Sequence, residues 1–484
     1  MQIVWSSRAG SRRIEYLGSA HSDAEVAALR KVAADRLAGG QQQLALDLAE
    51  PAAESSDSGA LRIVASRMGH LWDALERAYA RLGFEQATGA DEVFKQLVLA
   101  RIIEPTSKFD AARVLEEAGE PAASYATVKR RLAEYGRPRW RERLAGACAA
   151  HGQVGPATLV LYDVTTLYYE AHEGDGFREP GFSEERRLEP QITVGLLTDQ
   201  HGFPLQVDAF EGNTAETKTM LPVIEAFKSA HGLKDVTVVA DAGMVSEGNK
   251  KALEAAGLSF VLGEKMPKVP YQLQTWQKNH PDQEPADGQI LTQPWPAGPS
   301  DQRREHVIYY QYRSARARRT LRGIDQQVAK ARAAVNGKAP VKRNRFVTLT
   351  GGKKTLNTGM EATSRALAGW KADVTDRLDV GPEFVIGAHH QLWRIEQSFR
   401  MSKSDLRARP IYARKRDSIE AHLTVVFAAL AITRYIENTT GWTIKKFVQT
   451  ARRYQRVTLR VGEHLVPAEP DLPADLRTAL ALIT

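Results

Sequence analysis

Two aspartates and one glutamate stand where acids could do chemistry. The apolar run Thr158–Tyr162 leads into Asp163, and the run Val236–Ala240 leads into Asp241. A strand this apolar is buried on both faces, so an acid that follows it emerges at a sheet end, where open sheets place their sites. Taken singly, each aspartate also suits a turn or a cap. Together with Glu396, the pair would form a trio of carboxylates suited to hard divalent cations and to phosphoryl transfer.

Glu396 belongs to a stretch that should be one helix from Pro382 to Lys403, because a first-turn proline is tolerated there. Steps of three and four predict a mostly apolar face that comprises Leu392, Ile395, Phe399 and Ser402. A second face beside it would carry His389, Glu396, Arg400 and Lys403. The alternative for this second face is an ordinary solvated surface with a Glu-Arg pair.

The motifs resemble the DDE transposases of the bacterial insertion-sequence-four superfamily, most closely its sixteen-thirty-four branch. That family carries a helix in which Tyr, Arg, Glu and Lys are separated by two, three and six residues. Glu396 and Lys403 keep the last spacing, whereas His389 takes the Tyr position and Leu392 the Arg position. The likeness covers roughly residues 155 to 440 and includes the segment Arg409–Tyr412. Arg400, one turn past Glu396, could partly replace the missing Arg.

The resemblance implies a DNA transposase of the cut-and-paste type that cleaves and joins insertion-sequence ends. It implies two Mg²⁺ ions, for which Mn²⁺ could substitute, held by Asp163, Asp241 and Glu396. Phosphates of DNA would contact a basic set comprising Arg400, Lys403, His389, Arg407 and Arg409. The implied partners are double-stranded DNA, as terminal inverted repeats and as target, and a second copy in a homodimer on DNA. The implied location is the bacterial cytoplasm, at the nucleoid.

The implied fold is an α+β multidomain chain. It would have an α/β ribonuclease-H-like catalytic core interrupted by a β-rich insertion, preceded by a mainly helical DNA-binding region. The expected divisions are an N-terminal hairpin and helix (1–38), a flexible linker (39–60), a helical DNA-binding domain (61–152), the first part of the core (153–264), a basic β-rich insertion (265–380), the second part of the core with the glutamate helix (381–440), and a C-terminal region (441–484).

Local patterns predict the elements of the core. The expected strands are Leu159–Tyr162, Ile192–Thr198, Leu205–Phe210, a run ending at Asp241, and Leu258–Gly263. A turn at Gln200–Gly202 should join the second and third strands. Asn213–Ala226 should be helical, and Ser246 can cap the following helix.

Composition limits the class of protein. The 484 residues carry a net charge of +8, which favours a polyanionic partner. The single cysteine, Cys148, excludes an internal disulfide framework and fits a reducing cytoplasm. No signal peptide or membrane span is expected, since Met1–Leu17 should form a hairpin and the apolar stretch Leu423–Ile432 suits a core helix. A helix over Asp23–Leu37 and a low-complexity linker over Gly39–Gly59 should follow the hairpin.

Residues 61–152 should be helical, with successive helices over Asp91–Ile103, Lys108–Ala118 and Ser124–Tyr135. The third of these displays Lys129, Arg130 and Arg131 and is a candidate DNA-binding helix. A basic, solvated bundle is the alternative.

The segment Lys265–Val380 should begin with strands and loops around Tyr271, Trp276 and Trp295, followed by a strand at His306–Tyr312. A helix near Arg316–Ala334 and a strand at Arg345–Leu349 come next. Residues 301–346 hold thirteen Lys and Arg against three Asp and Glu, a net of +10, which suits a DNA backbone. By resemblance, Trp276 or Trp295 could hold a flipped base; a core tryptophan is the alternative for each.

The tail should contain an amphipathic helix with Lys445 and Arg452 and a strand at Val457–Val461, a region that by resemblance contacts another subunit. Two other functions stay open. One is a ribonuclease-H-like nuclease or resolvase without strand transfer. The other is a catalytically inactive DNA-binding protein derived from a transposase, which Leu392 at the Arg position favours and the three intact acids oppose.

Overall fold

The structure, a computed structural model, describes residues 2–6, 12–16, 61–155, 157–169, 173–181, 189–244, 246–281, 283–296, 304–338, 340, 344–350, 353–408, 415–461 and 463–483. The chain divides into two compact units, Met1–Ala60 and Leu61–Thr484. In the first unit, β1 (Gln2–Ser6) pairs antiparallel with β2 (Arg12–Tyr16), which confirms the predicted hairpin. The helix and the linker predicted to follow it lie outside the described residues.

The second unit begins with β3 (Arg62–Arg67) and a helical region. Its helices are α2 (Gly69–Arg81), α3 (Phe84–Thr88), α4 (Glu92–Ile103), α5 (Ala111–Ala118), α6 (Tyr125–Tyr135) and α7 (Pro138–His151). Asp91 begins α4 by accepting a hydrogen bond from the amide of Phe94, and Ser124 begins α6 by accepting one from Thr127. The helices predicted at these positions are confirmed.

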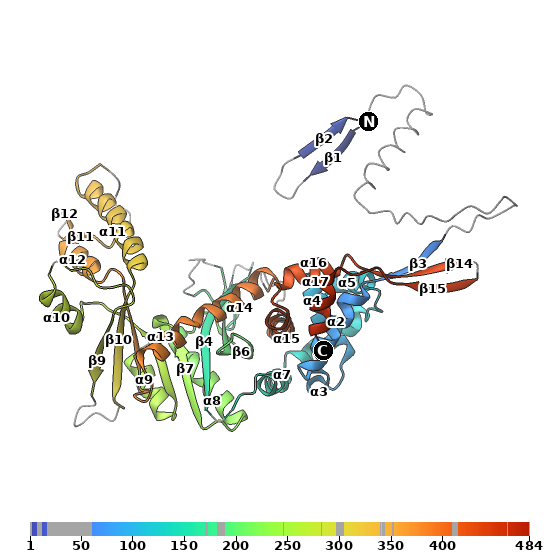
Figure 1. The fold of residues 1–484 in the computed structure, drawn as a ribbon, viewed down its shortest axis with the longest axis horizontal. Coiled ribbons are helices and arrows are strands. Elements are labelled where there is room, and N and C mark those ends of the chain that lie inside the picture. Colours follow the sequence, from blue (N-terminus) through green and yellow to red (C-terminus); the bar gives the residue numbers. More distant parts are fainter. Residues whose placement is uncertain are drawn as a thin grey trace. The chain divides into compact units, whose positions relative to one another are not determined.

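An eight-stranded mixed sheet forms the centre of this unit, in the order β6-β5-β4-β7-β8-β13-β10-β9 (Figure 1). Its first five strands are β4 (Ala157–Tyr168), β5 (Gln191–Asp199), β6 (Pro204–Glu211), β7 (Asp235–Ala240) and β8 (Ser259–Glu264). The pairs β4-β5 and β5-β6 are antiparallel, whereas β4-β7 and β7-β8 are parallel. This half of the sheet has the connectivity expected of a ribonuclease-H-like core.

The predicted first strand, Leu159–Tyr162, is too short, because the observed strand runs past Asp163. β4 continues to Tyr168, because it pairs with β5 from Val160, opposite Asp199, to Tyr168, opposite Gln191. On its other side β4 pairs with β7 only as far as Leu161 opposite Val239. Asp163 therefore lies inside β4, at the level where β7 ends and Asp241 follows.

The helix predicted as one piece from Pro382 to Lys403 is two helices, α13 (Pro382–His390) and α14 (Leu392–Ser404), separated by Gln391. α13 packs against β8, β13 (Trp370–Thr375) and β7, and α14 packs against β4 (Figure 1). Because of the break, His389 does not share the face of α14 that carries Glu396. The apolar face of α14 is confirmed, since Leu392, Ile395 and Phe399 are buried.

Shorter helices complete the core. They are η1 (Glu216–Lys218), α8 (Met220–Ala230), η2 (Ala242–Met244) and α9 (Glu247–Ala255). The helix predicted over Asn213–Ala226 thus begins later, after a 3-10 turn. Ser246 caps α9 as predicted, accepting a hydrogen bond from the amide of Asn249 at 3.1 Å.

The segment 265–380 was expected to be a β-rich insertion, but it does not form a separate β-rich domain. Its strands β9 (Ile290–Trp295), β10 (His306–Tyr312) and β13 extend the central sheet beyond β8. The remaining elements are α10 (Tyr271–Asn279), α11 (Ser314–Val335), β11 (Val347–Thr350), β12 (Lys353–Leu356) and α12 (Thr358–Ala366). The strand expected around Tyr271 and Trp276 is a helix instead, while the strand at His306–Tyr312 and the basic helix α11 are confirmed.

The longest helix is α15 (Arg416–Thr440), which packs against α4 and α6. It is long and apolar enough to cross a membrane, but its apolar window is completely buried inside the protein. This is the environment of a core helix, as predicted for Leu423–Ile432. The tail follows as α16 (Ile444–Ala451), β14 (Arg456–Val461), β15 (His464–Ala468) and α17 (Ala474–Leu482). β14 pairs with both β15 and β3.

Candidate active site

The three predicted acids line one cavity of about 860 Å³. Asp163 comes from β4, Asp241 from the end of β7, and Glu396 from α14. They meet because β4 and β7 run parallel in register and α14 packs across β4. The other residues used below that line the cavity are Glu216, Lys371, His389, Trp393, Arg400 and Lys403.

Asp163 is the acid most affected by its neighbours. Burial, and after it the charges of Asp241, Glu396 and Glu216, together raise its pKa to about 7. The amide of Val164 donates a 2.8 Å hydrogen bond to Asp163 Oδ1 and opposes the shift. A bound cation would offset the repulsion that the neighbouring carboxylates exert on Asp163.

The pKa of Asp241 is shifted in the opposite direction. Its side chain is 65% exposed, and its pKa is lowered to about 2, first of all by His389. The Nε2 atom of His389 lies 3.7 Å from Asp241 Oδ1. Burial alone would lower the pKa of His389, but Asp241 and Asp373 raise it overall. Near neutral pH the site thus holds an ionised Asp241 and an Asp163 that is only partly ionised.

His389 is buried, with only 1% of its side chain exposed, and its Nδ1 contacts the carboxylate of buried Asp373 on β13. Its ring therefore faces carboxylates on both sides and offers no surface to a DNA phosphate. The predicted phosphate contact does not fit this placement. The pattern of β13 contains a signal for this pairing, because Asp373 is a lone acid between the apolar residues Ala372 and Val374.

Basic side chains line the same cavity as the acids. Arg400 is exposed on α14, and Lys403 lies one turn further on. Lys371 on β13 was not predicted, and its charge lowers the pKa of both Asp241 and His389. Glu216 was missed as well, because it lies on a short 3-10 turn without a periodic pattern. Trp393, 48% exposed, is another unpredicted member of the cavity lining.

The donor set suits a hard divalent cation, since four carboxylates and no cysteine line the cavity. Among the described residues, no three His, Cys, Asp or Glu side chains stand close enough together to hold a metal ion. Side-chain movement would therefore have to bring the acids closer together around an ion.

Other predicted site residues lie elsewhere. Arg407 is exposed just beyond α14 in the left-handed backbone region, with φ of 44°. Arg409 lies outside the described residues. Lys129, Arg130 and Arg131 are exposed on α6, and Arg131 also pairs with Asp91 at 3.0 Å.

The two candidate tryptophans do not line the acid cavity. Trp276 stacks on His280 with ring centroids 4.9 Å apart, and Trp295 on β9 is 43% exposed.

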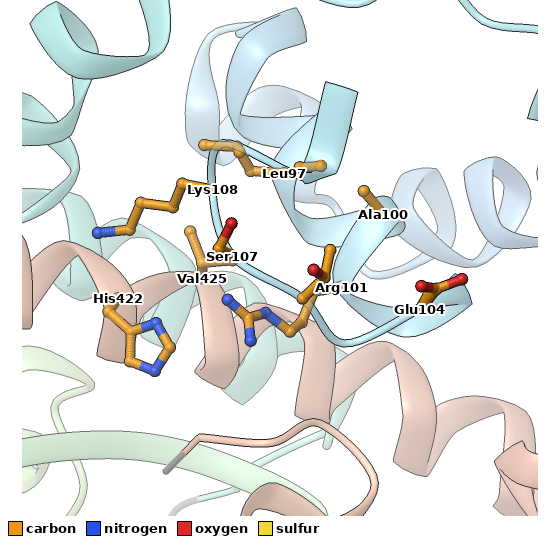
Figure 2. Close-up of a pocket in the computed structure, with 10 residues that line it drawn as sticks. Leu97, Ala100, Arg101, Glu104, Ser107, Lys108, His422 and Val425 are labelled. Carbon is orange, nitrogen blue, oxygen red and sulfur yellow. The ribbon is translucent and has the colours of Figure 1, made fainter. Parts of the chain in front are cut away.

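A second, very small cavity of about 10 Å³ lies between α4 and α15, where three basic side chains gather (Figure 2). Arg101 and Lys108 each donate a 3.3 Å hydrogen bond, to the carbonyls of Leu406 and Ser418 respectively. His422 Nε2 lies 3.1 Å from the carbonyl oxygen of Ala408. These contacts hold the chain where it leaves α14 and where it enters α15.

Burial disfavours the charged forms of these three basic groups. It lowers the pKa of Arg101 to about 10 and that of Lys108 to about 8, and it lowers the pKa of His422 well below its usual value. The volume has room for about one water molecule. The cluster is therefore best described as an anchor for the end of the glutamate helix.

Solved structures give only partial likenesses. A piggyBac transposase in a synaptic complex with hairpin DNA is 10% identical, with a TM-score of 0.40 over 78% of this chain and 70% of that one. A Mos1 transposase paired-end complex with left transposon end is 13% identical, with a TM-score of 0.15 over 51% of this chain and 69% of that one. Superpositions this loose support no inference about fold or function. No curated protein matches the sequence.

The family comparison is more extensive. The model of the transposase DDE domain matches residues 155–432, which is more than half of the 484 residues. The match begins just before β4 and ends within α15, so it contains all three acids and the helices that carry Glu396 and His389. The chain therefore belongs to the family of transposases with a DDE domain.

Proposed function

We propose that this transposase cleaves and joins the ends of an insertion sequence by phosphoryl transfer at Asp163, Asp241 and Glu396. The observation that carries the proposal is the convergence of the three acids, which are far apart in the sequence, on one cavity. The cationic side chains of Arg400, Lys403 and Lys371 line the same cavity. A site that combines carboxylates with cationic side chains suits a phosphodiester together with divalent ions.

Each residue has a distinct role in this mechanism. Asp163, Asp241 and Glu396 would hold two Mg²⁺ ions, which when bound polarise the scissile phosphate and lower the pKa of the attacking water or 3′-hydroxyl. Asp163, whose pKa is raised to about 7, would have to be deprotonated in order to hold a cation. Arg400 and Lys403 donate charge-assisted hydrogen bonds to phosphate oxygens and orient the DNA for in-line displacement.

Double-stranded DNA is the proposed partner, both as terminal inverted repeats and as target. The exposed basic residues of α6 and α11 would bind its backbone, and we propose a homodimer of the cut-and-paste type. The proposed location is the bacterial cytoplasm, at the nucleoid.

The test uses DNA that flanks the coding sequence, incubated with full-length protein and Mg²⁺. We expect nicks at the element ends, and we expect Asp163→Asn, Asp241→Asn and Glu396→Gln each to slow nicking by about 100- to 1000-fold. End binding in a gel-shift assay should persist in all three variants. The matched control is Glu225→Gln, which neutralises an exposed acid on α8 away from the cavity. Nicking at wild-type rates by any of the three variants would remove that acid from the mechanism.

A second assay separates a transposase from a nuclease with the same acids. Precleaved ends with free 3′-hydroxyls are supplied with a target plasmid. Joined products support strand transfer, whereas nicking without joining indicates a nuclease or resolvase.

A further inference from the structure

The ring of His389 lies between two carboxylates that belong to different strands. Asp373 on β13 contacts its Nδ1, and Asp241, which follows β7, lies 3.7 Å from its Nε2. His389 and Asp373 are both buried, at 2% exposure each, whereas the side chain of Asp241 is open to the acid cavity. The histidine thus connects the interior of the sheet to one of the three acids.

The Nε2 atom of His389 is a buried polar atom without a hydrogen-bond partner among the described residues. A separation of 3.7 Å from Asp241 Oδ1 is too long for a hydrogen bond. Buried polar atoms are nearly always paired, so a buried atom that lacks a partner requires an explanation. A small movement of the Asp241 carboxylate would supply the partner.

The His389 ring is held in place on the side that faces β8 and β13. Asp373 stands opposite Gly263 in the pairing of β13 with β8, and the histidine ring rests on that glycine. A Cβ atom on Gly263 would lie 2.9 Å from His389 Cε1 and 2.9 Å from the amide nitrogen of Ala242. The ring therefore occupies space that only a glycine leaves open, next to the backbone that follows Asp241.

We propose that His389 is a positioning residue for Asp241. Asp373 fixes the ring at Nδ1, and Nε2 hydrogen-bonds the Asp241 carboxylate in the orientation that binds a divalent cation together with Asp163 and Glu396. This inference rests on the proposed function and extends it to two residues that do not touch DNA. Carboxylates that bind metals are commonly held by such outer hydrogen bonds, whose loss costs about 10- to 100-fold in metal affinity.

Substitution of His389 by glutamine or by asparagine distinguishes the role of its Nε2 atom from that of its Nδ1 atom. In His389→Gln the amide nitrogen reaches about as far as Nε2 and can donate to Asp241. In His389→Asn the shorter amide reaches only toward Asp373. Asp373→Asn tests the anchor with little change of volume, and His464→Gln, at an exposed position on β15, is the matched control.

The measurement is calorimetric titration of the full-length protein with Mn²⁺. We expect His389→Asn and Asp373→Asn to raise the Kd by about 10- to 100-fold, and His389→Gln to stay within about threefold of the wild type. His464→Gln should match the wild type. The Tm of each variant is measured as well, with the metal chelated. If His389 has a purely structural role, its variants should have a lower Tm, and His389→Gln should not restore the Mn²⁺ affinity. If His389→Asn does not fold, the Mn²⁺ affinities of Asp373→Asn and His389→Gln are compared instead.

Two results would overturn the positioning role: wild-type Mn²⁺ affinity in His389→Asn or Asp373→Asn, or equal losses in His389→Gln and His389→Asn. In either case, loss of Mn²⁺ binding in Asp241→Asn would leave the proposed function standing. A wild-type protein that takes up no Mn²⁺ would contradict both proposals.

Discussion

At the scale of single residues, Asp163 and Asp241 differ in their protonation. The pKa of Asp163 is raised to about 7, first by burial and then by Asp241, Glu396 and Glu216. A carboxyl whose pKa is higher in the folded than in the unfolded chain stabilises the fold at low pH, and this contribution is lost as the pH rises through about 7. The metal-free site is therefore a source of instability at neutral and alkaline pH.

We expect Asp163→Asn to remove this pH dependence. In the presence of a chelator, the free energy of unfolding of the wild type should fall relative to that of the variant between pH 5 and pH 8, by roughly 1–4 kcal/mol. Urea titrations at several pH values measure this difference. Addition of Mg²⁺ should stabilise the wild type and leave the variant almost unchanged. Parallel pH profiles for the two proteins would contradict the assigned state of Asp163.

The identity of the acids could be predicted from sequence, but their electrostatic states could not. Each aspartate follows an apolar run, which indicates a sheet end without indicating its depth of burial. The pKa of Asp163 depends on Glu216, which lies on a 3-10 turn, and that of Asp241 depends on His389, which sequence reasoning placed on a DNA-facing surface. These contacts join residues that are distant in the chain and carry no periodic signal.

At the scale of elements, the position of α13 relative to the sheet depends on Gly263. A side chain there would press on the His389 ring and on the backbone after Asp241. The sequence predicted the strand Leu258–Gly263 but not this contact. It also predicted a single helix, whereas the break at Gln391 lets α13 and α14 pack on different strands of the sheet.

We therefore expect Gly263→Ala to destabilise the protein by about 1–3 kcal/mol, as added volume does in a filled interior. The control is Gly323→Ala on the basic helix α11, where a Cβ meets nothing within 4 Å and alanine should stabilise the helix by about 0.5–1 kcal/mol. Denaturant unfolding of both variants measures these changes. Equal effects of the two substitutions would show that the contact with His389 is loose.

The connection from α14 to α15 should respond to pH through Lys108. Burial, followed by the charge of Arg101, lowers the pKa of Lys108 to about 8. Because the folded chain disfavours the charged amine, the resulting cost is present below pH 8 and disappears as the pH rises toward the unfolded value of 10.5. Between pH 8 and pH 10, the free energy of unfolding of the wild type should thus increase relative to that of Lys108→Met. A constant difference across that range would show that Lys108 is not penalised by burial.

At the scale of the whole molecule, positive charge is concentrated rather than spread evenly. The chain has a net charge of +8, while residues 301–346 alone carry +10 from thirteen basic and three acidic residues. Much of this excess lies on α11, where Arg318, Arg322 and Lys330 are exposed. The sequence predicted both the helix and its charge, because local composition determines both. It did not predict that β9, β10 and β13 join the central sheet, since strand pairing is long-range.

We expect the double variant Arg318→Gln/Arg322→Gln to weaken DNA binding in proportion to salt. The slope of log K against log salt concentration should fall by about 1.8 if both arginines contact phosphates. The matched control, Lys234→Gln/Arg477→Gln, removes two exposed charges from other surfaces. Fluorescence anisotropy across a salt series measures both slopes, and equal slopes would assign the charge of α11 to solubility rather than to DNA.

The central claim is that Asp163, Asp241 and Glu396 close around shared cations. Its most direct test is to load the protein with Fe²⁺, which occupies Mg²⁺ sites, and to start peptide-backbone cleavage with ascorbate and peroxide. The account predicts cuts near all three positions in the same sample, each suppressed by excess Mg²⁺. Cuts near only one of the three acids, or cuts that Mg²⁺ does not suppress, would contradict a shared site.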